Sequence, residues 1–157
     1  MPRRLQTQIK QSRPFTSPEA KAFVNLLRTS SLLVAQLNDE LKASDLSQPQ
    51  YNVLRILRGA GADGLPSGEV GSRMVNRDPD VTRLLDRMET RGLVARSRAE
   101  TDRRVIVVRI TPHGRSILDA LDAPIEALHA RQLGHLSRTD LRTLNALLEK
   151  AREAVER

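Results

Sequence analysis

Apolar residues between positions 18 and 43 recur at alternating spacings of four and three, which aligns them on one face of a long helix. Thr16 or Ser17 supplies the N-cap of this helix, and Pro18 suits its first turn. A seam of this length requires a partner helix, either within the chain or on a second copy. The seam consists of Phe23, Leu27, Ser30, Val34, Leu37 and Leu41.

Two shorter helices are expected next. The first begins with a capping box, in which Ser47 and Gln50 satisfy each other's backbone N–H groups, and Gly59 is its expected stop. The second occupies residues 65–75 and has Ser67 as its cap. Its two glycines make it a weak helix in isolation, so packing must hold it in place.

A fourth helix is expected from Asp78, its N-cap, through Pro79 at the first helical position to a stop at Gly92. Its pattern separates a buried face from an exposed polar face. The buried face comprises Val81, Leu84, Leu85 and Met88, and the exposed face comprises Thr82, Arg83, Asp86, Arg87, Thr90 and Arg91.

The periodicity then changes from helical to alternating. Residues 93–99 and 104–110 alternate around the polar tip ETDRR, a pattern typical of a β-hairpin. In the second strand Ile106, Val108 and Ile110 share one face, because side chains two residues apart point to the same side of a strand.

Two further helices are expected in the rest of the chain. Thr111 and Pro112 start the first of them, and Pro124 within it is expected to kink it. Ser137 and Asp140 form a capping pair for the second. Their apolar stripes are Ile117, Leu118, Leu121, Ile125 and Leu128, and then Leu141, Leu144, Leu148, Ala151 and Val155. The order α-α-α-α-β-β-α-α predicts a mainly α fold with a small β-hairpin, an α+β arrangement.

The length of 157 residues fits one domain with a sizeable core. Residues 1–17 lack periodicity and are expected to form a flexible basic arm, which leaves 18–157 as a single domain. The absence of cysteine excludes disulfides, thiolate zinc sites and thiol-based sensing. Neither a run approaching the ~20 apolar residues of a membrane span nor a signal-peptide segment is found, so no membrane partner and a cytoplasmic location are expected.

The net charge of +7 is concentrated in two segments. Residues 1–17 contain four basic and no acidic residues, and residues 66–111 contain ten basic and seven acidic ones. Residues 18–65, with five of each sign, and residues 112–157, with seven of each, are neutral. Localised positive charge indicates a polyanionic partner, and an ordinary solvated basic surface is the alternative.

The third and fourth helices describe a helix-turn-helix whose second helix presents an exposed polar face. Arginine can bridge guanine O6 and N7, and threonine can contact a base edge, so Thr82 and Arg83 are expected to read the major groove. The arginine-rich hairpin tip suits the minor groove, whose negative potential attracts arginine, and Asp102 is placed to orient one. The expected DNA-binding residues are Arg77, Thr82, Arg83, Arg87, Asp102, Arg103 and Arg104.

Two carboxylates at the start of this helix run against DNA binding, because phosphates would lie close to them. Asp78 is accounted for as the helix cap. Asp80 is accounted for as a partner of Arg77 or Arg83, or as an acceptor from a cytosine amino group. A helix whose charges are merely solvated is the alternative.

Three stretches, LSQPQYNVLRIL, VTRLLDRMETRGLVAR and DRRVIVVRITPHG, resemble signature sequences of the MarR (multiple-antibiotic-resistance regulator) family of bacterial winged-helix transcription factors. The resemblance covers about residues 18–155. It implies a homodimer in which the helices of 18–46 and 112–157 intertwine around a winged helix-turn-helix of 47–111. One departure is the segment MVNRDPD, which lacks the hydrophobic-plus-serine turn common in the family and leaves its base contacts open.

The same resemblance implies a sequence-specific regulator of double-stranded DNA. A reading helix would enter each major groove and a wing each flanking minor groove, with Asp102 positioning Arg104. Because the dimer is symmetric, the operator is expected to be a pseudo-palindrome, and the expected direction of control is repression.

The resemblance also implies a small-molecule effector, bound between the dimerisation helices and the DNA-binding block. Aromatic residues make up only 2% of the chain, so an aromatic cage is not expected. Ordinary core and interface packing is the alternative for the same residues. The candidates are Leu26, Ser30, Tyr51, Leu54, Arg55 and His113.

No cofactor, metal site or enzyme activity is expected. The histidines at 113, 129 and 135 lack the i, i+4 spacing of a helical metal site, and no serine lies in a G-x-S-x-G turn. Two alternatives to a regulator stay open. One is an architectural DNA-binding protein with weak sequence preference, which the basic arm favours. The other is a small enzyme or protein-interaction module whose basic face is incidental.

Overall fold

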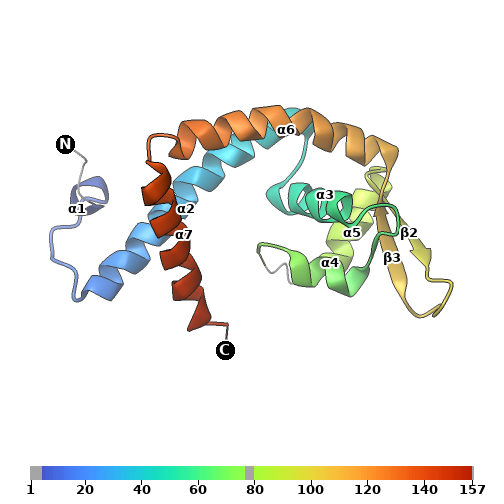
Figure 1. Cartoon of the computed structure of the whole chain (residues 1–157), viewed down its shortest axis with the longest axis horizontal. Helices are drawn as coiled ribbons and strands as arrows, with labels where there is room; N and C mark the ends of the chain where they lie inside the picture. Colours follow the sequence, from blue (N-terminus) through green and yellow to red (C-terminus); the bar gives the residue numbers. More distant parts are fainter. Residues whose placement is uncertain (1–4, 77–79, 157) are drawn as a thin grey trace.

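Long helices form one part of the molecule and a compact head forms the other (Figure 1). The computed structural model describes residues 5–76 and 80–156. Helices α2 (Pro18–Leu41) and α6 (Pro112–Leu133) pack against each other, and α7 (Arg138–Glu153) follows α6 after a short turn. The head, residues 48–110, is held below the beginning of α6.

In the described part of the head there are three helices and a small sheet. The three strands are antiparallel in the order β1-β3-β2, and the hairpin register pairs Val94 with Ile110 and Arg98 with Ile106. The expected β-hairpin and the mainly helical fold are therefore confirmed. The elements are α3 (Gln48–Ala60), β1 (Leu65–Pro66), α4 (Ser67–Arg73), α5 (Val81–Thr90), β2 (Val94–Arg98) and β3 (Ile106–Ile110).

The start signals expected for α2, α3, α6 and α7 form the expected hydrogen bonds. Ser17 caps α2 by accepting from the N–H of Ala20 at 3.1 Å. Capping boxes with both hydrogen bonds begin α3 and α7, at Ser47–Gln50 and Ser137–Asp140. These local contacts explain why the positions where the helices begin could be predicted from short stretches of sequence.

Two predictions about the α3–α4 region are wrong. Gly59 lies inside α3, which ends at Ala60, because Gly61 has the positive φ of 75° that releases the chain from the helix. Leu65 and Pro66 are not helical but form the strand β1, which pairs with Val108 and Val107 of β3. A two-residue strand has no periodicity of its own, so only its partner strand defines it.

The starts of α4 and α5 also differ from the prediction. Ser67 is the first residue of α4 rather than its cap, and its hydroxyl donates to the carbonyl of Ile106 at 3.2 Å. Helix α5 begins at Val81, with Asp80 as its cap. The expected cap Asp78 and the first-turn Pro79 lie outside the described residues.

The terminal segments add smaller differences. A single helical turn, α1 (Leu5–Gln8), lies within the expected basic arm. Helix α7 ends at Glu153, so the last residue of its expected stripe, Val155, lies beyond the helix. Pro124, which was expected to kink the helix, lies inside α6. The helix continues through it from Pro112 to Leu133 and curves over the head (Figure 1).

The core lies where α3, α5 and the sheet pack against the first part of α6. The buried face predicted for α5 is confirmed at Leu84, Leu85 and Met88, and Val81 is partly buried. Burial of large apolar side chains of this kind supplies the main driving force for folding. The most deeply buried side chains are Leu41, Val53, Leu54, Leu57, Val70, Leu84, Leu85, Met88, Leu93, Val94, Val108 and Leu118.

A close contact joins the end of α5 to the start of α6. The Thr111 hydroxyl donates to the Gly92 carbonyl at 2.6 Å and accepts from the N–H of Gly114 at 3.0 Å. A Cβ atom at Gly114 would lie 2.2 Å from the Leu93 carbonyl oxygen, so only glycine permits this approach. The stretch TPHG thus fixes the direction of α6 relative to the head.

Within the described part of the chain, none of the helices is both long and apolar enough to span a membrane.

Candidate nucleic-acid interface

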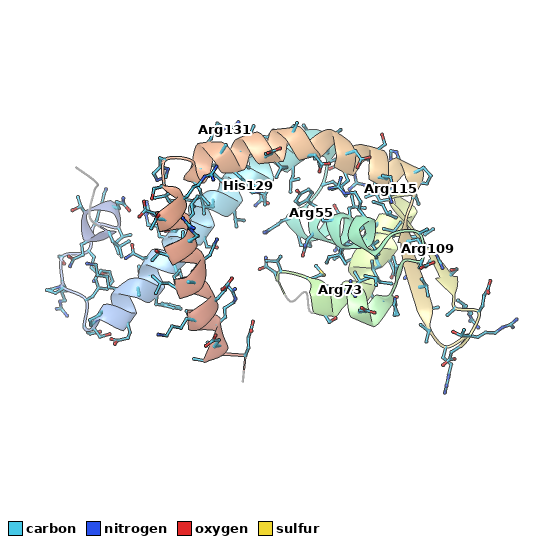
Figure 2. All side chains as sticks on the ribbon, viewed as in Figure 1. Arg55, Arg73, Arg109, Arg115, His129 and Arg131 are labelled. Carbon is cyan, nitrogen blue, oxygen red and sulfur yellow. The ribbon has the colours of Figure 1, made fainter. Side chains whose placement is uncertain are left out.

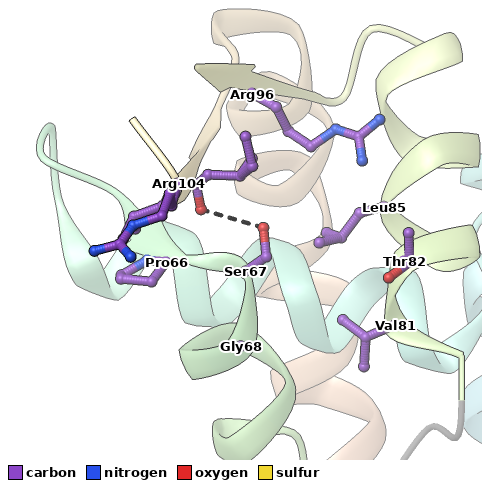
Figure 3. A pocket seen from close by; sticks show the side chains of 10 residues that line it. Pro66, Ser67, Gly68, Val81, Thr82, Leu85, Arg96 and Arg104 are labelled. Atoms are coloured by element: carbon purple, nitrogen blue, oxygen red, sulfur yellow. Dashed lines mark hydrogen bonds between the residues drawn. The ribbon is translucent and has the colours of Figure 1, made fainter. Parts of the chain in front are cut away.

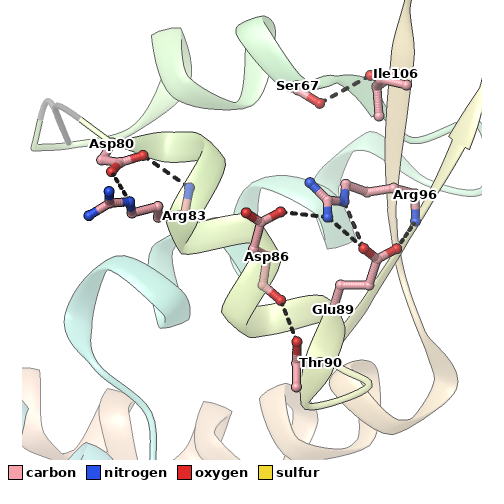
Figure 4. A network of polar contacts seen from close by, with 8 residues as sticks. All are labelled: Ser67, Asp80, Arg83, Asp86, Glu89, Thr90, Arg96 and Ile106. Atoms are coloured by element: carbon pink, nitrogen blue, oxygen red, sulfur yellow. Dashed lines mark hydrogen bonds and ion pairs between the residues drawn. The ribbon is translucent and has the colours of Figure 1, made fainter.

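The exposed face of α5 carries the side chains expected to read DNA. Thr82, Arg83 and Arg87 are exposed, while the opposite side of the helix is buried. Asp80 accepts from the Arg83 backbone N–H at 3.1 Å and pairs with the Arg83 Nε at 3.1 Å (Figure 4). The Asp80 carboxylate therefore both caps α5 and pairs with the Arg83 side chain. The pair with Arg83 is one of the explanations that the sequence offered for this carboxylate.

The other end of α5 is fixed to α3 and to the turn that precedes α3. Gly92, with φ of 67°, ends the helix, and the N–H of Leu93 bonds back to the Met88 carbonyl at 2.9 Å. The Arg91 guanidinium donates to the backbone carbonyl of Asp45 at 2.6 Å and to the buried Gln50 at 3.3 Å. Arg91, expected as part of the polar face, thus anchors α5 and is half-buried.

The wing, which is the hairpin of β2 and β3, carries the expected acid–arginine pair at its tip. Asp102 accepts from the Nε and Nη2 of Arg104, each at 3.1 Å, and from the Arg104 backbone N–H at 3.0 Å. These bonds hold the pKa of the Asp102 carboxyl below its ordinary value. The Arg104 side chain is 91% exposed, so its guanidinium is oriented while still accessible to a partner.

A hollow of about 450 Å³ separates the wing from α5 (Figure 3). Thr82 and Leu85 of α5 line one side, and Arg104 lies on the other side. Arg96, on β2, and Ser67, at the start of α4, also line it. The sequence did not point to these last two residues as part of the site, although Arg96 shares the inward face of β2 with the buried Val94.

The structure brings most of the expected DNA-binding residues to this side of the head. Thr82, Arg83 and Arg87 lie on α5, and Asp102, Arg103 and Arg104 lie at the wing tip, where Arg103 is exposed. Arg77 lies outside the described residues. The arrangement presents one helix and one hairpin tip, each bearing accessible arginine, on either side of a hollow.

The residues expected at an effector site are brought together only in part. Tyr51 and Arg55 line a hollow of about 130 Å³ with Asn52, Val75 and His129. The Arg55 guanidinium carbon lies 5.9 Å from the centre of the Tyr51 ring. A neighbouring hollow of about 200 Å³ shares Tyr51, Arg55 and His129.

The other expected effector residues lie elsewhere. Leu54 is fully buried in the core, so it lines neither hollow. Leu26 and Ser30 are exposed on the first part of α2, and His113 is exposed at the start of α6. Among the described residues, histidines and carboxylates form no group of three that could hold a metal ion.

A helix-turn-helix whose second helix has an exposed polar face and a buried opposite face, followed by a wing, defines a winged-helix DNA-binding fold. Residues 46–106 match the model of the MarR family. The transcriptional activatory protein BadR of Rhodopseudomonas palustris is 31% identical over 132 residues, which cover 82% of this chain and 75% of BadR. The chain therefore belongs to the MarR family of transcriptional regulators.

Solved structures agree with this assignment. A MarR transcription factor of Planctomyces limnophilus is 38% identical, with a TM-score of 0.66 over 87% of this chain and 98% of that one. MepR of S. aureus, solved as a complex with DNA, has the same fold at 21% identity, with a TM-score of 0.75 over 83% and 96% of the two chains.

Proposed function

We propose that this protein is a sequence-specific repressor that binds a pseudo-palindromic operator in double-stranded DNA as a homodimer and is released by a small molecule. The observation that carries the proposal is the accessible arginine on both sides of the hollow, Arg83 on α5 and Arg104 on the wing. A protein bound to both grooves would exclude other proteins from the same duplex, which is the basis for expecting repression.

The reading helix has dimensions and chemistry that suit the major groove. Its 10 residues span roughly 15 Å, and Thr82 and Arg83 lie in its first turn. The Arg83 side chain is 82% exposed, yet Asp80 holds its Nε, which leaves the terminal nitrogens able to bridge guanine O6 and N7. With α5 in the major groove, the wing would reach across the DNA backbone, and Arg104 would enter the flanking minor groove.

A homodimer accounts for apolar side chains that the single chain leaves uncovered. Phe23, Leu26, Leu27 and Leu32 of α2 are exposed, as is Leu147 of α7. Contiguous apolar surface on a protein usually marks an interaction site, and a second copy offers the same two faces in return. A monomeric mass at micromolar concentration in sedimentation equilibrium would refute this part of the proposal.

An effector would act from the two neighbouring hollows between α3 and α6. Tyr51 and the stem of Arg55 supply apolar surface, and the Arg55 guanidinium supplies positive charge, which suits a small organic anion. One of these hollows is also lined by Met74, Val75 and Asn76, which follow α4. Binding there would release DNA only if the effector prefers a head position that the operator does not accept.

Selection of binding sites from random duplexes, at near-physiological salt, tests the proposal. A recovered pseudo-palindrome with half-sites about 10 base pairs apart is expected. In repeat selections, Arg83→Ala should relax the preference at one position per half-site, by about 1–3 kcal/mol. Arg104→Ala should weaken binding mainly at AT-rich flanks.

Arg115→Ala is the matched control for these two variants. Arg115 is an exposed arginine on α6, beside the ends of the strands opposite the wing tip (Figure 2). Arg115→Ala removes one positive charge, as Arg83→Ala does, but at a position away from the wing tip. It should therefore leave the recovered motif unchanged. An Arg83 variant whose preferences equal those of the wild type would contradict the assignment of Arg83 as a reader.

The basic segment of residues 1–17 favours one alternative, an architectural protein that coats DNA. Its four basic and no acidic residues would add phosphate contacts without reading bases. This alternative predicts that the selection recovers no motif and that binding falls steeply as salt rises.

A reporter gene placed behind the recovered operator tests repression. Expression of the reporter is expected to rise when the gene for the regulator is deleted.

A further inference from the structure

The wing and the reading helix are joined by a bridge that centres on Arg96 of β2 (Figure 4). Its Nη2 lies 2.6 Å from the Oδ1 of Asp86 and 2.6 Å from the Oε2 of Glu89, both on α5. Its Nε also donates to the Glu89 Oε2, at 2.9 Å. One guanidinium therefore connects two carboxylates of the reading helix to the first strand of the wing.

The bridge fixes an angle as well as a distance. The second oxygen of Glu89, Oε1, accepts from the backbone N–H of Arg96 at 3.1 Å, so Glu89 holds both the main chain and the side chain of that residue. Charge-assisted hydrogen bonds from a planar guanidinium allow little freedom of orientation. The side-chain bond from Arg96 lowers the pKa of the Glu89 carboxyl, and the same bond raises the pKa of Arg96.

The other strand of the wing has a separate attachment. The Ser67 hydroxyl donates to the carbonyl of Ile106 at 3.2 Å, which connects β3 to α4. Beyond Arg98 and Ile106 the tip projects from the head, with Arg103 and Arg104 exposed (Figure 1). The direction of the tip is therefore set at its base, where Arg96 is the only strand residue that pairs with α5 carboxylates among the described residues.

Arg96 also borders the hollow between the two DNA-facing elements (Figure 3). Asp86 lies on the exposed face of α5, and its carboxylate would repel DNA phosphates if it were unpaired. The guanidinium that joins the elements thus compensates this charge too. Both effects depend on the positive charge of Arg96 rather than on its bulk.

We propose that Arg96 is a positioning residue for DNA recognition: it sets the distance between the Thr82–Arg83 end of α5 and Arg104, so that both elements reach their grooves together. The proposal rests on the DNA-binding function proposed above. It assigns Arg96 no base contact. Its role is to make the contribution of Arg104 available in the geometry that α5 imposes.

A double-mutant cycle on the duplex recovered by selection tests the proposal. Affinity is measured for the wild type, Arg96→Met, Arg104→Ala and the double variant, at a temperature where circular dichroism shows each to be folded. In the wild-type background, Arg104→Ala should weaken binding about tenfold, because a charge-assisted contact is lost. In the Arg96→Met background the same change should cost less than about twofold, because the arginine is no longer positioned.

Arg98→Met is the matched control, since Arg98 is the next arginine along the same strand and is exposed. In this background Arg104→Ala should keep its full cost, even if the loss of one charge lowers the overall affinity. Glu89→Gln provides a second route to the same result with little change in volume, in case Arg96→Met fails to fold. It should also reduce the cost of Arg104→Ala.

The outcomes separate the two proposals. If the wild type recovers no motif and Arg104→Ala has no effect, the proposed function fails and the role of Arg96 fails with it. A second case is that the wild type recovers the motif and Arg104→Ala weakens its binding as expected, while the cost of Arg104→Ala is the same in every background. In that case only the role of Arg96 is overturned. Independent costs would mean that Arg96 contacts DNA directly or acts on stability alone.

Discussion

The head and the long helices use the same kinds of apolar residue with opposite results. In the head, Leu57 of α3 and Leu84 of α5 are essentially fully buried by residues of the same chain. On the long helices, Phe23 and Leu27 of α2 are 62% and 55% exposed, and Leu147 of α7 is 60% exposed. Periodicity therefore predicts helices in both regions, but on α2 and α7 the chain itself leaves part of the apolar face uncovered.

This difference separates what a single chain can stabilise from what it cannot. Burying one large apolar side chain contributes about 1.5–3 kcal/mol, so each uncovered leucine of α2 represents stabilisation that the isolated chain lacks. The buried residues of the head are covered by the head itself and by α6, whereas Phe23, Leu27 and Leu147 are left uncovered. The proposed homodimer supplies a surface to cover them, and the substitutions below test each side of the contrast.

The largest effect is expected from a charge on the uncovered face. Leu27→Glu would bury two carboxylates in a symmetric dimer, and the penalty for a buried charge is on the order of several kcal/mol. We expect a shift from dimer to monomer in sedimentation equilibrium and a loss of operator affinity of at least about 100-fold. Asn25→Glu, an exposed position close to the opposite side of α2, is the control and should remain dimeric. An unchanged mass for Leu27→Glu would contradict the dimer surface.

A cavity in the head tests the other side of the contrast. Leu57→Ala removes a fully buried side chain, so the free energy of unfolding should fall by about 2–5 kcal/mol in urea titrations. Dimer mass should not change, because Leu57 lies in the core rather than on an apolar outer face. A loss below about 1 kcal/mol would mean that the head relaxes around the cavity and is less tightly packed than its burial indicates.

The parts of the fold that could be predicted depend on contacts within a few residues. Helix starts at Ser17, Ser47, Thr111 and Ser137 follow from caps that bond three residues ahead. Asp102 was expected to orient an arginine of the hairpin tip, and the family resemblance indicated Arg104, two residues further along the chain. In each of these cases the partner lies only two or three residues away.

The parts that could not be predicted depend on distant partners. Serine is a common helix cap, but the Ser67 hydroxyl donates to the carbonyl of Ile106, 39 residues away. Arg91 was expected on the open polar face, yet it reaches Asp45, 46 residues away. Sequence patterns cannot tell which of several compatible partners a side chain meets when the partner is brought close only by folding.

A smaller effect is expected where the head joins the long helices. Arg58 of α3 donates to Asp119 once and to Asp122 twice, each at 2.8 Å, and both carboxylates lie on α6. Arg58→Met should lower the free energy of unfolding by about 1–2 kcal/mol, because three charge-assisted bonds are lost at a partly buried site. Lys42→Met removes the exposed pair with Asp39 and should cost at most about 0.5 kcal/mol. Equal costs for the two variants would show that the Arg58 bridge does not hold the head to α6.

The smallest effect is the pH dependence of the same bridge. The hydrogen bond from Arg58 holds the pKa of Asp122 below its ordinary value of 3.8. A carboxyl with a lowered pKa in the folded state stabilises the protein above its unfolded pKa, and the contribution is lost as pH falls through the folded pKa. The difference in unfolding free energy between the wild type and Asp122→Asn should therefore be constant near neutral pH and shrink below about pH 4, from at most about 1 kcal/mol because the carboxylate is half-exposed. Urea titrations of both proteins between pH 3 and pH 7 measure it. A difference that stays constant down to pH 3 would mean that Asp122 contributes through its shape and hydrogen bonds, not through its charge, and that the head is held to α6 without an ion pair.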